Sequence, residues 1–146
     1  MKTFIADSNY HQFYVADRDL EQDAPEEWTH EDVNNHHLTA RHIAALSPVG
    51  DIDARIISCG PCDPIPDFPD SADFEVRTQI EVPFGKVGIY GWPWELEDHY
   101  DIPPGICDIL FRGYATARTE EEADYYLVKI NPIQGARRSC CWRWLW

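Results

Sequence analysis

The chain contains one long alternating stretch, Phe74–Phe84, with the sequence FEVRTQIEVPF. Apolar residues occupy every second position apart from Thr78, and polar residues or proline stand between them. The apolar set is Phe74, Val76, Ile80, Val82 and Phe84. Because successive side chains of a strand point to opposite faces, this alternation predicts a long strand with one face on a core and the other in water.

Two further strands are predicted directly after this stretch. Gly85-Lys86 indicates a turn, Val87–Trp92 a returning strand, and Ile106–Tyr114 a third strand. The segment between the second and third strands, through Gly105, is expected to be a loop. Since three antiparallel strands can hold one hydrophobic face, we expect these three to form a meander to which the rest of the chain is added.

Shorter strands are predicted around the meander, at Lys2–Asp7, Tyr10–Ala16, Leu38–Leu46, Ile52–Cys59 and Asp124–Ile130. One short helix is predicted to start after Thr29, a good N-cap residue, with acidic residues in its first turn, and to end near His37. The predicted fold class is therefore all-β: an antiparallel β-sandwich of about eight strands with one short helix.

The chain divides by composition into two parts. Residues 1–130 carry the predicted strands and form the expected β-sandwich domain. Residues 131–146 form a basic, tryptophan-rich C-terminal tail with Arg137, Arg138, Arg143, Trp142, Trp144 and Trp146. Three exposed tryptophans would favour aggregation. We therefore expect the tail to pair as a strand, to dock on an apolar groove, or to join two copies into a homo-oligomer.

The charge balance restricts the classes of partner. The chain has 26 acidic and 12 basic residues, for a formal net charge of −14. Such acidity argues against a nucleic-acid or anionic-membrane binder and fits a basic protein partner, or solubility alone. There is no apolar segment of about 18 residues and no signal-peptide pattern, so a cytoplasmic protein is expected. Five cysteines, an odd number, favour reduced thiols.

Two features suggest other chemistry. Cys59-Gly60-Pro61-Cys62 has the spacing of half a zinc site or of a redox motif. It lacks both a second ligand pair at the usual spacing and a βαβ context, so no metal and no cofactor are predicted. The neighbouring loop contains Asp63, Asp67, Asp70 and Asp73, whose oxygens suit calcium. A calcium- or ligand-binding β-sandwich module is therefore the alternative reading.

Enzyme signatures are weak. The sequence has no Gly-x-Ser-x-Gly elbow and no glycine-rich phosphate loop. Six histidines leave open a small hydrolase that uses a histidine or a cysteine. The protein is predicted not to be an enzyme.

Several short segments resemble, in the same order, the competence protein J family of DNA-entry nuclease inhibitors. They are Tyr10–Val15 (YHQFYV), Glu27–Val33 (EWTHEDV), Glu81–Phe84 (EVPF), Val87–Ile89 (VGI) and Asp101–Gly105 (DIPPG), within residues 4 to 130. The resemblance implies a small acidic protein that binds a nuclease and blocks it, either a DNA-entry nuclease inhibitor or an immunity protein against a nuclease toxin.

The partner-binding surface is predicted in the acidic stretch Asp17–Asp32. Nucleases bind phosphates in basic clefts, and an acidic surface can occupy such a cleft. Trp28, Trp92 and Trp94 are core candidates first. Trp92 and Trp94 flank Pro93 near a loop, and an exposed tryptophan beside acids would suit a protein interface. The predicted partner-binding residues are Asp19, Glu21, Asp23, Glu26, Glu27, Trp92 and Trp94.

Overall fold

A computed structural model describes residues 1–6, 12–21, 23–25, 27–49, 54–91, 94–118 and 123–133. Within these residues the chain forms ten strands and one helix. The strands are β1 (Lys2–Ala6), β2 (Phe13–Asp17), β3 (His37–Thr39), β4 (Ile43–Leu46), β5 (Ala54–Cys59), β6 (Ala72–Val82), β7 (Lys86–Gly91), β8 (Glu95–Asp101), β9 (Gly105–Tyr114) and β10 (Tyr125–Pro132), and the helix is α1 (His30–Asn34). The predicted mostly-β class is confirmed, and the predicted strand number, about eight, is wrong.

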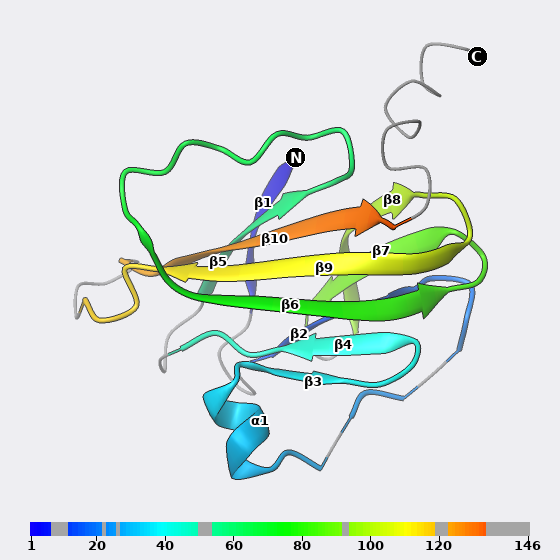
Figure 1. The fold of residues 1–146 in the computed structure, drawn as a ribbon, viewed down its shortest axis with the longest axis horizontal. Coiled ribbons are helices and arrows are strands. Elements are labelled where there is room, and N and C mark those ends of the chain that lie inside the picture. Colours follow the sequence, from blue (N-terminus) through cyan, green and yellow to red (C-terminus); the bar gives the residue numbers. More distant parts are fainter. Residues whose placement is uncertain are drawn as a thin grey trace.

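The strands form two five-stranded sheets (Figure 1). Sheet A has the order β1-β5-β10-β9-β6, and sheet B has the order β3-β4-β2-β7-β8. β5 and β10 pair in parallel, which makes sheet A mixed, while the other strand pairs are antiparallel, so the predicted antiparallel sandwich is confirmed only in part. Alternation within single strands cannot reveal this pairing, because β5 and β10 are far apart in the sequence.

The predicted meander is wrong because β6 and β7 belong to different sheets. β6 pairs with β9 in sheet A, whereas β7 lies between β2 and β8 in sheet B. Pro83, which has no N–H to donate, follows the last residue of β6. Gly85 then adopts a φ of 69°, a conformation that favours glycine. This turn carries the chain from one sheet to the other.

The alternation of β6 holds as far as this turn. Val76, Ile80 and Val82 are buried in the interior, and Phe74 packs against it. Phe84 lies beyond the end of the strand and is 54% exposed, so its predicted core position is wrong. The period of two ends where the chain turns.

Two other predictions about strands need correction. The predicted loop before Gly105 contains β8, an edge strand that pairs antiparallel with β7. The predicted strand Leu38–Leu46 is a hairpin of β3 and β4, closed by a bond from the Ala40 N–H to the Ile43 carbonyl at 2.8 Å. The sequence of β8, ELEDHYD, has too few apolar residues to signal a strand.

Helix α1 starts where the sequence predicts. The Thr29 hydroxyl accepts a bond from the Asp32 N–H at 3.1 Å, and the Asp32 carboxylate accepts one from the Thr29 N–H at 2.9 Å. These two bonds form a capping box. The helix ends at Asn34, three residues before the predicted end. No helix in the described part of the chain is long and apolar enough to cross a membrane.

Apolar side chains form three clusters. The main core lies between the sheets, where Phe13 of β2 meets Phe111 of β9 edge to face at 5.5 Å. The second cluster lies on the outer face of sheet A, where Phe68 of the loop 60–71 covers Tyr114 and Tyr125. The third lies on the outer face of sheet B. Both sheets therefore need cover on both faces.

β10 ends at Pro132. Residues 134–146, most of the predicted tail, lie outside the described residues, so the division into a domain and a tail stays a prediction.

A buried carboxylate holds the end of β2 against the turn after β6. Asp17 is 2% exposed, and its Oδ2 accepts a bond from the Phe84 N–H at 2.8 Å. Its Oδ1 accepts a bond from the Asp19 N–H at 2.9 Å. One side chain thus satisfies two backbone donors, one of them from a distant part of the sequence.

We predict that Asp17→Ala lowers the free energy of unfolding by about 1–3 kcal/mol, because it leaves these backbone donors without their partner. Urea denaturation measures this change. Asp23→Ala, at an exposed position in the following loop, is the control and should change stability by less than about 0.5 kcal/mol. Equal stability of the two variants would contradict the bridging role of Asp17.

Candidate partner-binding face

The outer face of sheet B carries an aromatic cluster. Val15 of β2 and Ile89 of β7 point into the main core, so their neighbours Tyr14 and Tyr90 point outward. Trp94, at the start of β8, stacks on Tyr90 with ring centroids 4.4 Å apart and an interplanar angle of 6°. The Trp94 ring also lies 5.4 Å from that of Tyr14. The three rings form one aromatic cluster contributed by different parts of sheet B.

Trp94 is the exposed member of this cluster. Its exposed fraction is 40%, whereas Tyr14 and Tyr90 are almost completely buried. Leu96, which lies opposite Tyr90 in the β7–β8 register, is 38% exposed. The outer face of sheet B therefore presents an indole and an aliphatic side chain to solvent. Trp92, the other tryptophan predicted at this surface, lies outside the described residues.

The acidic stretch packs on the same cluster. Its start is fixed to β7 by a bond from the Arg18 N–H to the Lys86 carbonyl at 2.6 Å. Further along, Ala24 and Trp28 pack against the cluster that contains Tyr14 and Tyr90. Trp28 is half-buried here and packs on the outer face of sheet B, so it is not one of the fully buried core residues.

The acids predicted to bind a partner are exposed wherever the structure describes them. These are Asp19, Glu21, Asp23 and Glu27. Glu26 lies outside the described residues. Trp94 and the segment that carries the described acids both pack against one apolar cluster, through Trp94 itself and through Ala24 and Trp28. The role of the acids and of Trp94 in binding stays a prediction.

Gly88 makes room for this arrangement. A Cβ atom at Gly88 would lie 2.6 Å from Cε2 of Tyr90 and 2.7 Å from Cγ of Arg18. Any side chain at this position would displace the Tyr90 ring on which Trp94 stacks. Close packing against Tyr90 and Arg18 thus explains why the segment Val87–Ile89 has a glycine at position 88.

Two further acids were missed by sequence analysis, and they lie on the side of β8 opposite to Leu96, because Glu95 pairs with Gly91 while Leu96 pairs with Tyr90. Glu95 and Glu97 belong to β8, which was predicted to be a loop. Burial raises the pKa of the Glu97 carboxyl above its usual value, and the nearby Glu95 carboxylate raises it further. Glu97 lies over β7, with its Cγ 3.7 Å from the position of a Cβ at Gly91. A polar edge strand gives no periodic signal, so only its pairing with β7 reveals these residues.

Three of the four aspartates of the alternative calcium reading, Asp63, Asp70 and Asp73, bond to separate partners. Asp63 accepts bonds from the Gly60 N–H and the Met1 amino group. Asp70 accepts bonds from Arg118 and the Tyr125 hydroxyl, and Asp73 accepts from Thr116. Among the described residues, no group of three or more histidines, cysteines or acids could hold a metal ion. These carboxylates fix loops to the sheets.

The two cysteines of the C-x-x-C motif differ in environment. Cys59 is the last residue of β5 and is buried, and burial raises the pKa of its thiol. Cys62 is exposed in the loop that follows. A raised thiol pKa disfavours the thiolate that nucleophilic chemistry needs.

Comparisons with known proteins identify the fold. No protein-family model matches the chain, and no curated protein matches its sequence. The structure is similar to the crystal structure of ComJ from Bacillus subtilis, the inhibitor of the DNA-degrading activity of NucA, with a TM-score of 0.70 and 18% identity, over 89% of this chain and 94% of that chain. This chain has a competence protein J-like fold.

The resemblance stated from the sequence is thus confirmed at the level of the fold. A second structure, of crocagin biosynthetic gene J, covers 91% of this chain and 96% of its own, with a TM-score of 0.47 and 15% identity. That likeness carries no argument about this chain.

We predict that Glu97→Gln raises the melting temperature at pH 7. A raised pKa in the folded state means that the ionised carboxylate opposes folding above that pKa. The difference from the parent should disappear as the pH falls below the usual range for glutamate, where the parent carboxyl is protonated both folded and unfolded. Thermal melts from pH 7 to about pH 3 measure this.

Asp67→Asn removes one negative charge from an exposed position in the loop 60–71 and serves as the control. If both variants gain the same stability at pH 7, the effect comes from net charge and not from the site of Glu97.

Proposed function

We propose that this protein binds and inhibits a DNA-degrading nuclease. The observation that carries the proposal is the likeness of its fold to ComJ, which spans most of both chains. The face formed by the exposed acids and Trp94 supports it with a surface of suitable chemistry. Binding, and not catalysis, is the proposed activity, and the proposed partner is a basic protein in the cytoplasm.

The acidic loop competes with DNA for the nuclease in this proposal. A nuclease cleft collects lysine and arginine to bind phosphates. Asp19, Glu21, Asp23 and Glu27 are exposed on a loop fixed at both ends to sheet B, so their carboxylates need little ordering on binding. Long-range attraction between the two surfaces speeds association and weakens with salt.

Trp94 is the proposed anchor within this face. Its ring is held by stacking on Tyr90, so that little side-chain entropy is lost when a partner covers it. A half-exposed indole beside acids can pack against aliphatic chains and accept cationic groups over its ring. Interfaces draw much of their affinity from such aromatic residues.

We predict that neutralising the acidic loop slows association with the nuclease. The variant combines Asp19→Asn, Glu21→Gln, Asp23→Asn, Glu26→Gln and Glu27→Gln. Association at low salt should slow by about tenfold or more, with a smaller change in dissociation, because surface charges act mainly on the encounter. Surface plasmon resonance against a nuclease encoded beside this protein, together with a DNA-degradation assay, measures both effects. NucA is the comparison nuclease.

A charge-matched pair of variants tests the location of the effect. Glu21→Gln with Asp23→Asn removes two charges from the loop, and Asp67→Asn with Asp108→Asn removes two exposed charges from the side of sheet A. The first pair should slow association and the second should leave it within about twofold of the parent. Equal slowing would assign the effect to net charge. If the parent inhibits neither nuclease, the proposed function itself is wrong.

We also predict that Trp94→Ala weakens nuclease binding by about 30-fold, mainly through faster dissociation, as expected for an interface anchor worth about 2 kcal/mol. The control is Ile5→Ala, which truncates another exposed apolar residue, 53% exposed on β1 of the other sheet. Melting curves of both variants check that neither substitution unfolds the protein. Dissociation rates that match for Trp94→Ala and the parent would remove the indole from the interface.

A further inference from the structure

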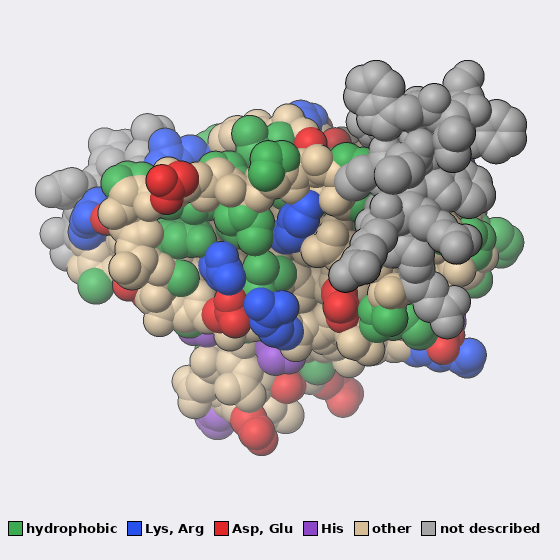
Figure 2. Space-filling view, turned by 45° about the horizontal axis from the view of Figure 1, so that its top comes forward, with side chains coloured by type: hydrophobic (Ala, Val, Ile, Leu, Met, Phe, Trp, Pro, Cys, Tyr) green, Lys and Arg blue, Asp and Glu red, His purple; other side chains and the backbone are tan. Residues whose placement is uncertain are grey.

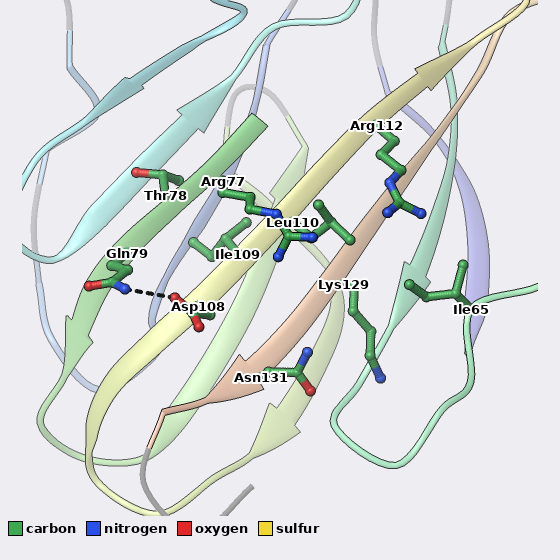
Figure 3. Close-up of a pocket in the computed structure, with 10 residues that line it drawn as sticks. All are labelled: Ile65, Arg77, Thr78, Gln79, Asp108, Ile109, Leu110, Arg112, Lys129 and Asn131. Atoms are coloured by element: carbon green, nitrogen blue, oxygen red, sulfur yellow. Dashed lines mark hydrogen bonds between the residues drawn. The ribbon is translucent and has the colours of Figure 1, made fainter. Parts of the chain in front are cut away.

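The outer face of sheet A contains a groove of about 550 Å³. Its floor is formed by β6, β9 and β10, and Ile65 of the loop 60–71 forms one wall (Figure 3). Figure 2 shows basic and apolar side chains together on this side of the molecule. Its volume is in the range of ligand-binding clefts.

The register of the strands explains the chemistry of the floor. Leu110 of β9 lies opposite Arg77 of β6 on one side and Lys129 of β10 on the other. Asp108 lies in the same way between Gln79 and Asn131. The floor is thus an apolar centre between cationic positions, followed by a row in which the Asp108 carboxylate accepts a bond from the Gln79 amide at 2.9 Å.

Salt bridges hold the two arginines over the groove. Glu75 accepts bonds from Arg112 Nε at 2.8 Å and from Arg77 Nε at 3.3 Å. The bond to Glu75 raises the pKa of the Arg112 guanidinium. Arg112 also bonds the side chain of Tyr114. A guanidinium has five N–H donors, more than these bonds use. In Figure 3 the side chains of Arg77 and Arg112 lie on either side of Leu110.

Lys129 brings a basic side chain to the groove, but its N–H donors already bond to carbonyls of the protein. Its Nζ donates to the carbonyls of Gly60, Pro61 and Asp63 and is buried beneath the loop. The ammonium is therefore fixed in place beneath the loop, on a residue that lies opposite Leu110 in the strand register. Arg77, Arg112 and Lys129 outnumber Asp108 among the charged residues that line the groove, in a chain whose net charge is −14.

We propose that the groove binds an acidic, extended segment of a partner protein. Carboxylates of the segment would pair with Arg77 and Arg112, because a guanidinium matches a carboxylate in shape and charge. Apolar side chains between them would contact Leu110 and Ile65. This site is on the opposite side of the molecule from Trp94, since the two lie on the outer faces of different sheets.

The groove suits a peptide better than a nucleic acid. None of its lining residues is aromatic, so it offers no ring on which bases could stack. A nucleic acid would also bring a dense row of phosphates to a strongly acidic protein. A segment with a few carboxylates separated by apolar residues satisfies the groove without that repulsion.

The proposal is tested by fluorescence anisotropy with the full chain and a labelled eight-residue peptide in which glutamate and leucine alternate. The same peptide with lysine in place of glutamate, and an eight-nucleotide single-stranded DNA, are the competing probes. The parent should bind only the acidic peptide, and binding should weaken as salt increases. Tighter binding of either competing probe would overturn the proposal.

Variants locate the site. Arg77→Gln with Arg112→Gln should weaken binding of the acidic peptide by about tenfold or more, since charge-assisted bonds are lost. Arg41→Gln, at an exposed arginine of the β3–β4 hairpin paired with Glu81, should change it by less than about twofold. Ile65→Glu, at a wall position that is 39% exposed, should also weaken it, through charge repulsion. Parent-like affinity of the double arginine variant would overturn the proposal.

A chain that ends at Ile133 tests whether the protein's own C-terminal segment occupies the groove. It should bind the acidic peptide with the affinity of the full chain. A tenfold gain in affinity on removing residues 134–146 would instead identify the protein's own C-terminal segment as the occupant and overturn the proposal. The Arg77→Gln, Arg112→Gln variant should inhibit a nuclease as well as the parent does. The groove proposal and the nuclease proposal can therefore fail independently of each other.

Discussion

The central strands of both sheets bury side chains on both of their faces, and the rest of the structure depends on this constraint. Every residue of β2 and β4 is buried, and so is every residue of β10 except Asn131. Two sheets packed together cover only their inner faces. The outer faces are covered by the segment that contains Ala24 and Trp28 on sheet B, and by the loop with Phe68 on sheet A. Long connections are therefore part of the packing here.

The two candidate binding surfaces lie where these covers end. On sheet B the cover leaves Trp94 and Leu96 exposed beside the aromatic cluster. On sheet A the loop 60–71 covers Tyr114 and Tyr125 through Phe68 and leaves the floor around Leu110 as a groove. Each surface combines an apolar centre held by the sheet with charged side chains at its edge. Loops on a rigid sheet commonly carry binding sites for this reason.

Sequence reasoning reached the parts of the fold that depend on local pattern. The alternation of β6 and the cap at Thr29 follow from side-chain period and from backbone hydrogen bonding within a few residues. The assignment of β6 and β7 to different sheets, and the parallel pairing of β5 with β10, depend on contacts between distant residues. The same limit applies to the site: the acids and Trp94 were identified by type, but their shared face depends on packing against Tyr14 and Tyr90.

The acidity of this protein has two physical roles that composition cannot separate. Several carboxylates are fixed by structural bonds: Asp17 accepts from the Phe84 N–H, Asp32 accepts from the Thr29 N–H at the start of α1, and Asp73 accepts from the Thr116 N–H. Their charge is committed to backbone and hydroxyl donors within the protein. The exposed acids of the loop after β2 have carboxylates that face solvent, so they determine the field that a partner meets at that side. On sheet A, Arg77, Arg112 and Lys129 bring basic side chains into one groove that contains a single acid, Asp108. A partner is thus selected by the local arrangement of charge on a face, and the net charge of the chain describes neither face.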